Sequence, residues 1–264
     1  GRPGPHCHTR RRRCVTSRAR VGSLARSPRG RPAMAMEMEV DMRSDTVTLP
    51  TAAMRQAMFD CEVGDDVLGA DPSAVALQEH CAALFGKEAA LFVPSGTMGN
   101  LICVMVHCDR RGSEAIVGAD SHMHLWEQGG MATIAGVHPR PIANQPDGTL
   151  AVDDIRRHVR ADDAHFPRTR LVCLENTAMR KGGRVLTAEY IDAVGALCEE
   201  LQLKLHVDGA RVANACVALG VAPARLCRAA HSVTMCLSKG LGAPVGSVVM
   251  GSAAFIAEAR RARK

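Results

Sequence analysis

Short apolar runs alternate along the chain with longer stretches whose apolar residues recur at helical spacing. After Ser73, apolar residues at steps of three and four lead to Gly86, which predicts one helix. Seven strands are predicted, most of them from short apolar runs, over 89–93, 115–117, 136–141, 171–174, 204–207, 232–237 and 247–250. Further helices are predicted near 98–107, 152–159, 188–201, 210–217 and 253–263. This alternation favours an α/β domain with a mostly parallel or mixed sheet.

Charge is unevenly distributed over the 264 residues. Residues 1–33 hold ten arginines and no acid, so subtracting +10 from the formal net charge of +6 leaves −4 for residues 34–264. The basic balance therefore gives no support to a nucleic-acid partner for the folded part. An aromatic content of 3% also argues against base stacking. The sequence contains no apolar run of about 18 residues, so it predicts no membrane-spanning helix.

The N-terminal segment, residues 1–36, is expected to be a disordered basic tail that precedes a domain over residues 37–264. Its arginines and serines without acids are typical of a mitochondrial transit peptide. A basic arm for nucleic acid is a further alternative. The interpretation we favour is that this segment is not native and that the true start is Met34. We therefore expect a cytoplasmic protein, or a mitochondrial one if the tail is a transit peptide.

Eleven cysteines are present, and none of them form a CxxC pair. Most lie within apolar runs, and their number is odd. These features indicate reduced, buried thiols and an intracellular compartment. They predict no metal site.

Charged residues follow two of the predicted strands. Asp208 and Arg211 come after one strand, and Lys239 comes after another. Parallel sheets bind ligands beyond the carboxyl ends of their strands. A desolvated lysine can form a Schiff base, a carboxylate can keep a pyridine nitrogen protonated, and an arginine can bind a phenolate or carboxylate. The simpler alternatives are an exposed loop lysine and an Asp–Arg pair that caps a helix.

Two further motifs can complete such a site. Ser95, Gly96 and Thr97 stand where a helix is predicted to begin, and free N–H groups there suit a phosphate, or Ser95 is an ordinary N-cap. His122 can stack on a cofactor ring and move a proton, whereas a solvated loop position is favoured for His124. A phosphate site, a stacking ring, a carboxylate and a lysine together match pyridoxal phosphate (PLP).

At this point several stretches make the chain recognisable. It resembles the low-specificity L-threonine aldolases (L-allo-threonine aldolases), which have the aspartate-aminotransferase type of PLP fold. The resemblance runs from about residue 41 to residue 264. Its matching stretches include DMRSDTVTLP at 41–50, EVGDDVLGADP at 62–72, FGKEAALFVPSGTMGN at 85–100, HVDGAR at 206–211 and LSKGLGAPVG at 237–246.

The resemblance implies a PLP-dependent lyase that splits L-threonine or L-allo-threonine, both small β-hydroxy amino acids, into glycine and acetaldehyde by retro-aldol chemistry. It implies that Lys239 binds the cofactor aldehyde and that Asp208 pairs with the pyridine nitrogen. Arg211 would contact the cofactor phenolate or the substrate carboxylate, and Ser44 would help to bind that carboxylate. A homodimer or homotetramer is the implied assembly.

The remaining implied roles concern the phosphate and the reacting proton. Gly96 and Thr97, with Ser95 beside them, would hold the phosphate. His122 would stack over the ring and, directly or through water, move the proton of the β-hydroxyl group.

Departures from the family pattern keep an alternative open. Ala178 and Met179 stand where the family has a His-Asn pair, and Leu68 replaces a tyrosine. The chain ends at Lys264, before the small C-terminal domain that in the family supplies a second arginine. An inactive or weakly active homologue that keeps the fold, or a fragment of a complete enzyme, would account for these departures. A different PLP lyase, such as a β-eliminating one, is disfavoured by RSDTVT and LSKGLGAPVG.

Overall fold

A seven-stranded sheet forms the centre of the computed structural model, which describes residues 40–264; the expected basic tail lies outside this range. All seven predicted strands are present, in the spatial order β1-β7-β6-β5-β4-β2-β3. They are β1 (Ala89–Val93), β2 (Ser113–Gly118), β3 (His138–Ile142), β4 (Arg168–Glu175), β5 (Lys204–Asp208), β6 (Ser232–Cys236) and β7 (Ser247–Gly251).

The sheet is mostly parallel, as predicted. β7 pairs antiparallel with β1 and with β6. The pairs β6–β5, β5–β4, β4–β2 and β2–β3 are parallel. The carboxyl ends of β4, β5 and β6 therefore meet at one edge of the sheet, which places Glu175, Asp208 and the loop after Cys236 close together.

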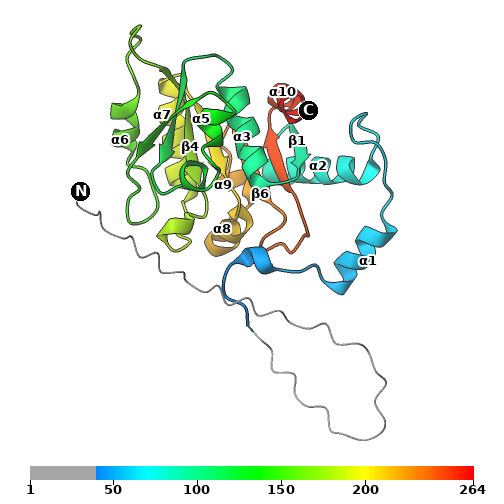
Figure 1. Ribbon diagram of the computed structural model, residues 1–264. Coiled ribbons are helices and arrows are strands. Elements are labelled where there is room, and N and C mark those ends of the chain that lie inside the picture. Colours follow the sequence, from blue (N-terminus) through cyan, green and yellow to red (C-terminus); the bar gives the residue numbers. More distant parts are fainter. Residues whose placement is uncertain (1–39) are drawn as a thin grey trace, which may run out of the picture. The chain divides into compact units, whose positions relative to one another are not determined.

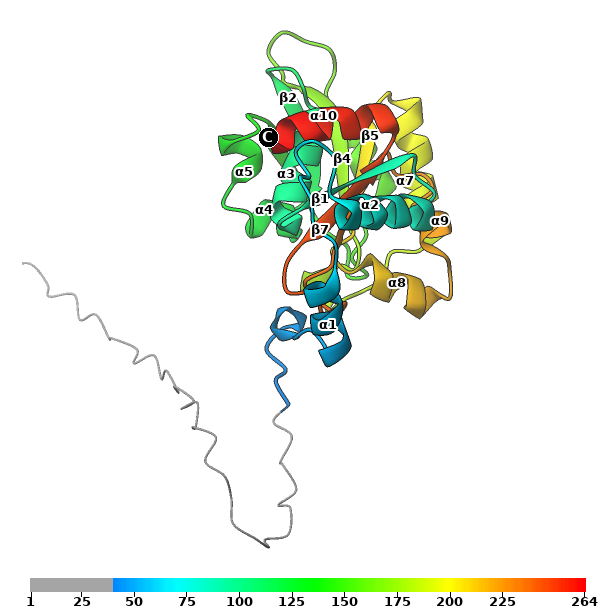
Figure 2. The same cartoon turned by 90° about the vertical axis from the view of Figure 1, so that its right-hand side faces the viewer.

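Helices cover both faces of the sheet (Figures 1 and 2). On one face, α3 (Gly96–His107) and α10 (Ala253–Arg263) share a hydrophobic cluster with Leu91, Val93 and Val249. The other face packs Leu205 and Val207 against helices that include α2, α7 and α8. The remaining bounds are α1 (Ala52–Asp60), α2 (Pro72–Phe85), α4 (His122–Leu125), α5 (Gly130–Thr133), α6 (Val152–His158), α7 (Ala188–Glu200), α8 (Val212–Leu219) and α9 (Pro223–Leu226), with 3-10 turns η1 (Asp45–Val47) and η2 (Met179–Lys181).

Several helices differ from the prediction for identifiable reasons. α1 buries none of its residues, so the sequence there shows no apolar stripe. α4, α5 and α9 have four residues each, too few for a periodic pattern. α8 begins at Val212 and not at Ala210, because the backbone N–H of Ala210 donates to Asp208 Oδ1.

The cysteine prediction can be checked over the described residues. All nine cysteines there are free, and eight are buried, with Cys61 exposed. The expectation of buried thiols is confirmed for these eight. Among residues 40–264, no helix is both long and apolar enough to cross a membrane.

Candidate functional site

A cavity lies where β5 and β6 end and α3 begins. Its volume is about 190 Å³. Of the eight residues predicted to bind cofactor or substrate, six line it, and two, Ser44 and Arg211, do not. The six are Ser95, Gly96, Thr97, His122, Asp208 and Lys239. The structure thus brings together groups that are up to 144 positions apart, from Ser95 to Lys239.

The amino end of α3 forms one wall of the cavity. Ser95 is the N-cap of the helix, and its Oγ accepts a hydrogen bond from Met98 N at 3.1 Å. The N–H groups of Gly96 and Thr97 precede the first intrahelical bond, from Gly99 N to Ser95 O, and remain as donors for an anion. A Cβ atom at position 96 would lie 2.8 Å from Cys236 Sγ, so this approach requires glycine. Both readings of Ser95, N-cap and neighbour of a phosphate site, are compatible with this geometry.

Asp208 ends β5 and is almost completely buried, with 2% exposed. Its Oδ1 accepts from Ala210 N at 3.1 Å, and its Oδ2 accepts from Asn100 Nδ2 at 2.9 Å. The alternative interpretation, in which Asp208 and Arg211 form a local ion pair, is wrong. Three residues further along, Arg211 binds Asp45 through Nε and Nη2, both at 2.6 Å.

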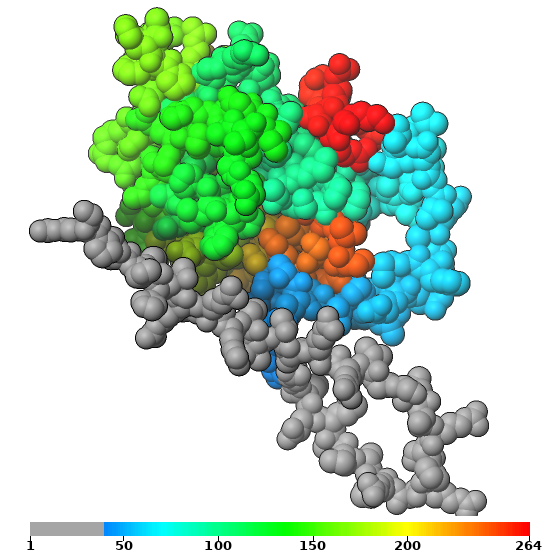
Figure 3. Space-filling view, viewed as in Figure 1, coloured from blue at the N-terminus to red at the C-terminus, as the bar shows by residue number. Residues whose placement is uncertain are grey.

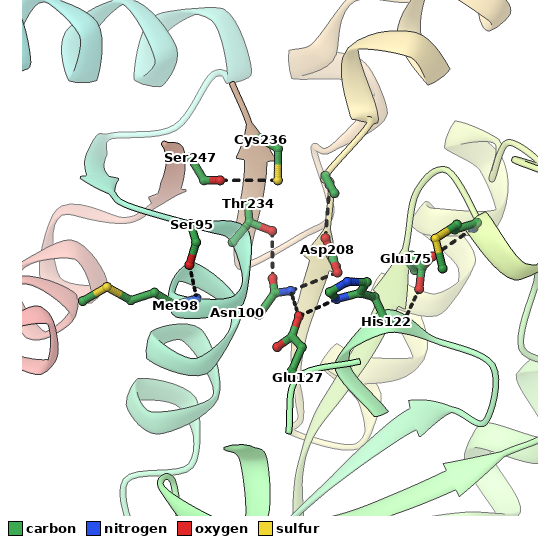
Figure 4. Close-up of polar contacts among 12 residues, drawn as sticks. Ser95, Met98, Asn100, His122, Glu127, Glu175, Asp208, Thr234, Cys236 and Ser247 are labelled. Carbon is green, nitrogen blue, oxygen red and sulfur yellow. Dashed lines mark hydrogen bonds and ion pairs between the residues drawn. The ribbon is translucent and has the colours of Figure 1, made fainter. Parts of the chain in front are cut away.

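His122 is held from two sides (Figure 4). Its backbone N–H donates to Glu175 Oε2 at 2.6 Å, and its Nδ1 lies 2.9 Å from Glu127 Oε1. The hydrogen bond with Glu127 raises the pKa of His122, and the negative charge of Asp208 adds to this, against the effect of burial. Burial raises the pKa of both Glu127 and Glu175. The ring is thus fixed by its Nδ1, which leaves Nε2 for a ligand.

A Glu127→Gln substitution should lower the pKa of His122. It removes the carboxylate that favours the imidazolium, while the burial that favours the neutral ring remains. NMR titration of the His122 ring signals should therefore show a midpoint at lower pH than in the wild type. Glu200→Gln, at an exposed ion pair with Arg156, is the control and should leave this midpoint unchanged. A midpoint that stays or rises in Glu127→Gln contradicts the role of Glu127.

Lys239 follows β6 in the loop that closes the cavity, and it is half-buried. Its carbonyl oxygen accepts a hydrogen bond from Thr48 Oγ1 at 2.6 Å. Lys239 is thus a loop lysine, as in the simpler alternative, but it lines the cavity and is not fully exposed. In Figure 3 the blue segment that begins the described part of the chain lies against an orange segment from the C-terminal part, which agrees with this hydrogen bond.

Ser44 lies outside the cavity lining. It is the exposed N-cap of η1, and its Oγ accepts from Thr46 N at 3.2 Å. The next residue, Asp45, carries the bidentate ion pair with Arg211. Ser44 and Arg211, the two residues predicted to bind the substrate carboxylate, are thus connected through Asp45. The Arg211 guanidinium forms its ion pair with the Asp45 carboxylate.

Five residues that line the cavity were not predicted, and two of them, Asn100 and Glu127, contact predicted site residues through their side chains. Asn100 is 1% exposed on α3, and its Nδ2 donates to Glu127 Oε1 and to Asp208 Oδ2, both at 2.9 Å. A signal existed, because an amide interrupts an apolar helix there. Glu175, whose carboxylate accepts a hydrogen bond from the backbone N–H of His122, was not predicted either.

His122, Glu127 and Asp208 each offer one possible ligand atom, and these three atoms lie within 4.8 Å of one another. This spacing is compatible with a metal ion. However, the Asn100 amide bridges the two carboxylates, and His122 binds one of them. These bonds account for the closeness of the cluster with groups of the chain itself.

The cavity fits PLP on four counts. A helix N-terminus with free N–H groups suits the phosphate. Asp208 is buried with its carboxylate at the cavity wall, where it suits a pyridine nitrogen. Lys239 provides an amine, and the ring of His122 lies at the same cavity.

Comparison with known proteins gives consistent results. Residues 41–264 match the model of the family described as beta-eliminating lyase. Low-specificity L-threonine aldolase 1 of Arabidopsis thaliana is 57% identical over 85% of this chain and 63% of its own length. The low specificity L-threonine aldolase of Escherichia coli K12 is 48% identical, over 85% and 66%. The chain thus spans just under two thirds of the length of these relatives.

A solved structure supports the fold. Threonine aldolase of Leishmania major superposes with a TM-score of 0.65 at 22% identity, over 84% of this chain and 63% of that one. The match to the family model covers the whole sheet and every cavity residue. The chain therefore belongs to the beta-eliminating lyase family, which is PLP-dependent, and its sequence is similar to those of low-specificity threonine aldolases.

Proposed function

We propose that this protein cleaves L-threonine and L-allo-threonine to glycine and acetaldehyde with PLP as its cofactor. The observation that carries the proposal is the cavity that joins Lys239, Asp208, His122 and the amino end of α3. The relatives in Arabidopsis and Escherichia coli, both low-specificity threonine aldolases, support the choice of reaction. Such a reaction consumes threonine and forms glycine.

The residues of the cavity divide the work of binding. When bound, PLP supplies an electron-poor ring that takes up the electron pair of the breaking Cα–Cβ bond. Lys239 Nζ would hold the cofactor through its aldehyde carbon. The Asp208 carboxylate would keep the proton on the pyridine nitrogen. The N–H groups of Gly96 and Thr97 would bind the phosphate.

His122 is proposed to move the reacting proton. Since its Nδ1 is bound to Glu127, the free Nε2 is the atom that would accept the proton of the β-hydroxyl group. The raised pKa of His122 makes the ring a stronger base for this step. With the proton removed, the oxygen can form the carbonyl group of acetaldehyde as the Cα–Cβ bond breaks.

Arg211 and Ser44 are proposed to bind the substrate carboxylate. Arg211 already binds a carboxylate, that of Asp45, in the two-pronged geometry that a substrate would use. A substrate carboxylate at this position would displace the Asp45 carboxylate. Ser44 is the residue that precedes Asp45 in the chain. We also propose a homodimer or homotetramer, on the basis of the family resemblance.

The test combines a spectrum with product analysis. The full chain, mixed with PLP, should show the visible absorption of a lysine-bound cofactor. It should then release acetaldehyde and glycine in equal amounts from each threonine epimer. A bound cofactor without glycine would support a homologue that keeps the fold but not the activity. Release of pyruvate and ammonia from a β-substituted amino acid in place of glycine would support β-elimination, which the family description keeps as the second candidate.

A further inference from the structure

Behind the cavity, polar side chains fill one face of two neighbouring strands. His206 and Asp208 alternate with apolar residues on β5, and Ser232 and Thr234 do so on β6. The register pairs His206 with Ser232 and Asp208 with Thr234. All four are at most 2% exposed. Because side chains two residues apart share a face, these four form one polar patch inside the protein.

Helix α3 packs on this face and adds two polar groups, Asn100 and His107. They are seven residues apart and so lie on the same side of the helix. Asn100 Oδ1 accepts from Thr234 Oγ1 at 2.9 Å and lies 3.2 Å from His206 Nε2. Ser232 Oγ lies 2.9 Å from His206 Nδ1 and 2.8 Å from His107 Nε2. A continuous series of hydrogen bonds therefore connects His107 to Asp208.

The direction of each bond follows from its partners. The Asn100 group that faces the carboxylates of Glu127 and Asp208 must be the NH₂ group, so its oxygen faces His206. His206 Nε2 must then carry hydrogen. Burial lowers the pKa of His206 to about 4, so at neutral pH its Nδ1 is bare and accepts from the Ser232 hydroxyl.

The same argument applies to the other end of this series of hydrogen bonds, at His107. The single hydroxyl hydrogen of Ser232 is used on His206, so Ser232 Oγ accepts from His107 Nε2–H. Burial also lowers the pKa of His107 to about 3, which keeps this ring neutral. Every hydrogen in the series thus points toward the two carboxylates, and each bond polarises the next in the same sense.

We propose that Asn100 and His206 are positioning residues for the cofactor site, with Asn100 as the clamp that fixes the carboxylates of Asp208 and Glu127. His206 fixes the orientation of the Asn100 amide. Through its two hydrogen bonds, the Asn100 side chain positions both Asp208, which would face the pyridine nitrogen, and Glu127, which binds His122. The proposal rests on the PLP binding of the proposed function.

The test compares Asn100→Leu, His206→Leu and His206→Gln in the full chain. The first two variants should weaken PLP binding by about tenfold to a hundredfold, as expected when hydrogen bonds to a charged group are lost. The ¹⁵N resonance of ring-labelled PLP should move toward that of an unprotonated pyridine nitrogen. His206→Gln places an amide N–H near the position of Nε2 and should restore both properties.

His231→Leu is the matched control. His231 is a second, half-buried histidine whose Nδ1 accepts from Leu205 N and which makes none of the bonds to Asn100. It should lower thermal stability without changing PLP affinity or the ¹⁵N resonance. The cofactor-free protein gives an independent readout, because ¹⁵N NMR of His206 should show hydrogen on Nε2 and a bare Nδ1.

The outcomes separate the two proposals. A wild-type chain that does not bind PLP overturns the proposed function, and this inference with it. Wild-type binding, with an unchanged ¹⁵N resonance and affinity in His206→Leu, overturns the inference alone. Hydrogen on Nδ1 of His206 and none on Nε2 overturns it as well. If Asn100→Leu does not fold, the comparison of His206→Leu with His206→Gln still decides.

Discussion

Replacing Lys239 with alanine should abolish the visible absorption of the bound cofactor and reduce threonine cleavage by about 10³-fold or more. Lys239 lines the cavity together with Asp208 and His122, and its amine is the group that can bond to an aldehyde there. The main-chain contact from Thr48 involves only the carbonyl of residue 239, so alanine leaves it in place. The fold should therefore survive the change.

Absorption spectroscopy of the protein after gel filtration, followed by an acetaldehyde assay, measures both effects. Lys204→Ala is the control, because Lys204 is an exposed lysine at the opposite end of β5 from Asp208. It should retain both the absorption and the activity. Persistence of the lysine-bound absorption in Lys239→Ala would show that another amine holds the cofactor, and the site assignment would be wrong.

The strands were predictable because their apolar character is local. Six of the seven contain a short apolar run, and β3, with the sequence HPRPI, is the exception. The structure shifts the ends of the predicted strands by a few residues at most. The run at 232–237 was read as apolar, yet Ser232 and Thr234 alternate with apolar residues and face α3. Alternation of this kind on a completely buried strand predicts a buried polar network.

The site was predictable where function imposes residue types at the ends of strands and helices. Lys239, Asp208 and His122 all reach the cavity as expected. The pairing of Arg211 with Asp45 was not predictable, since it joins positions 166 residues apart and no local pattern encodes it. Asn100 was missed because its two carboxylate partners come from separate parts of the chain.

The second large effect is expected for Asp208→Asn, which keeps the shape of the side chain and removes its charge. The pyridine nitrogen would lose the anion that holds its proton, so the ring would withdraw electrons less well. Turnover should fall by about 10²- to 10³-fold, as when a single electrostatic contact to developing charge is removed. The cofactor should still bind, because Lys239 and the amino end of α3 are unchanged.

This substitution has a second consequence that can be measured without turnover. Both Asp208 oxygens accept hydrogen bonds, from Ala210 N and from Asn100 Nδ2. An asparagine must place its own NH₂ group against one of these donors, which should lower the free energy of unfolding by about 1–3 kcal/mol. Removing the negative charge should also lower the pKa of His122 and of Glu127, since Asp208 raises both.

Steady-state kinetics, ¹⁵N NMR of labelled PLP and chemical unfolding distinguish these effects. Asp208→Glu, which keeps the charge, should recover part of the pyridine protonation and less of the turnover, because its longer side chain misplaces the carboxylate. Asp192→Asn, which removes ion pairs with Arg225 and Arg228 outside the cavity, is the control and should leave turnover and the ¹⁵N resonance of PLP unchanged. If Asp208→Asn keeps wild-type turnover, then Asp208 does not serve the pyridine nitrogen, and its burial beside Asn100 is structural.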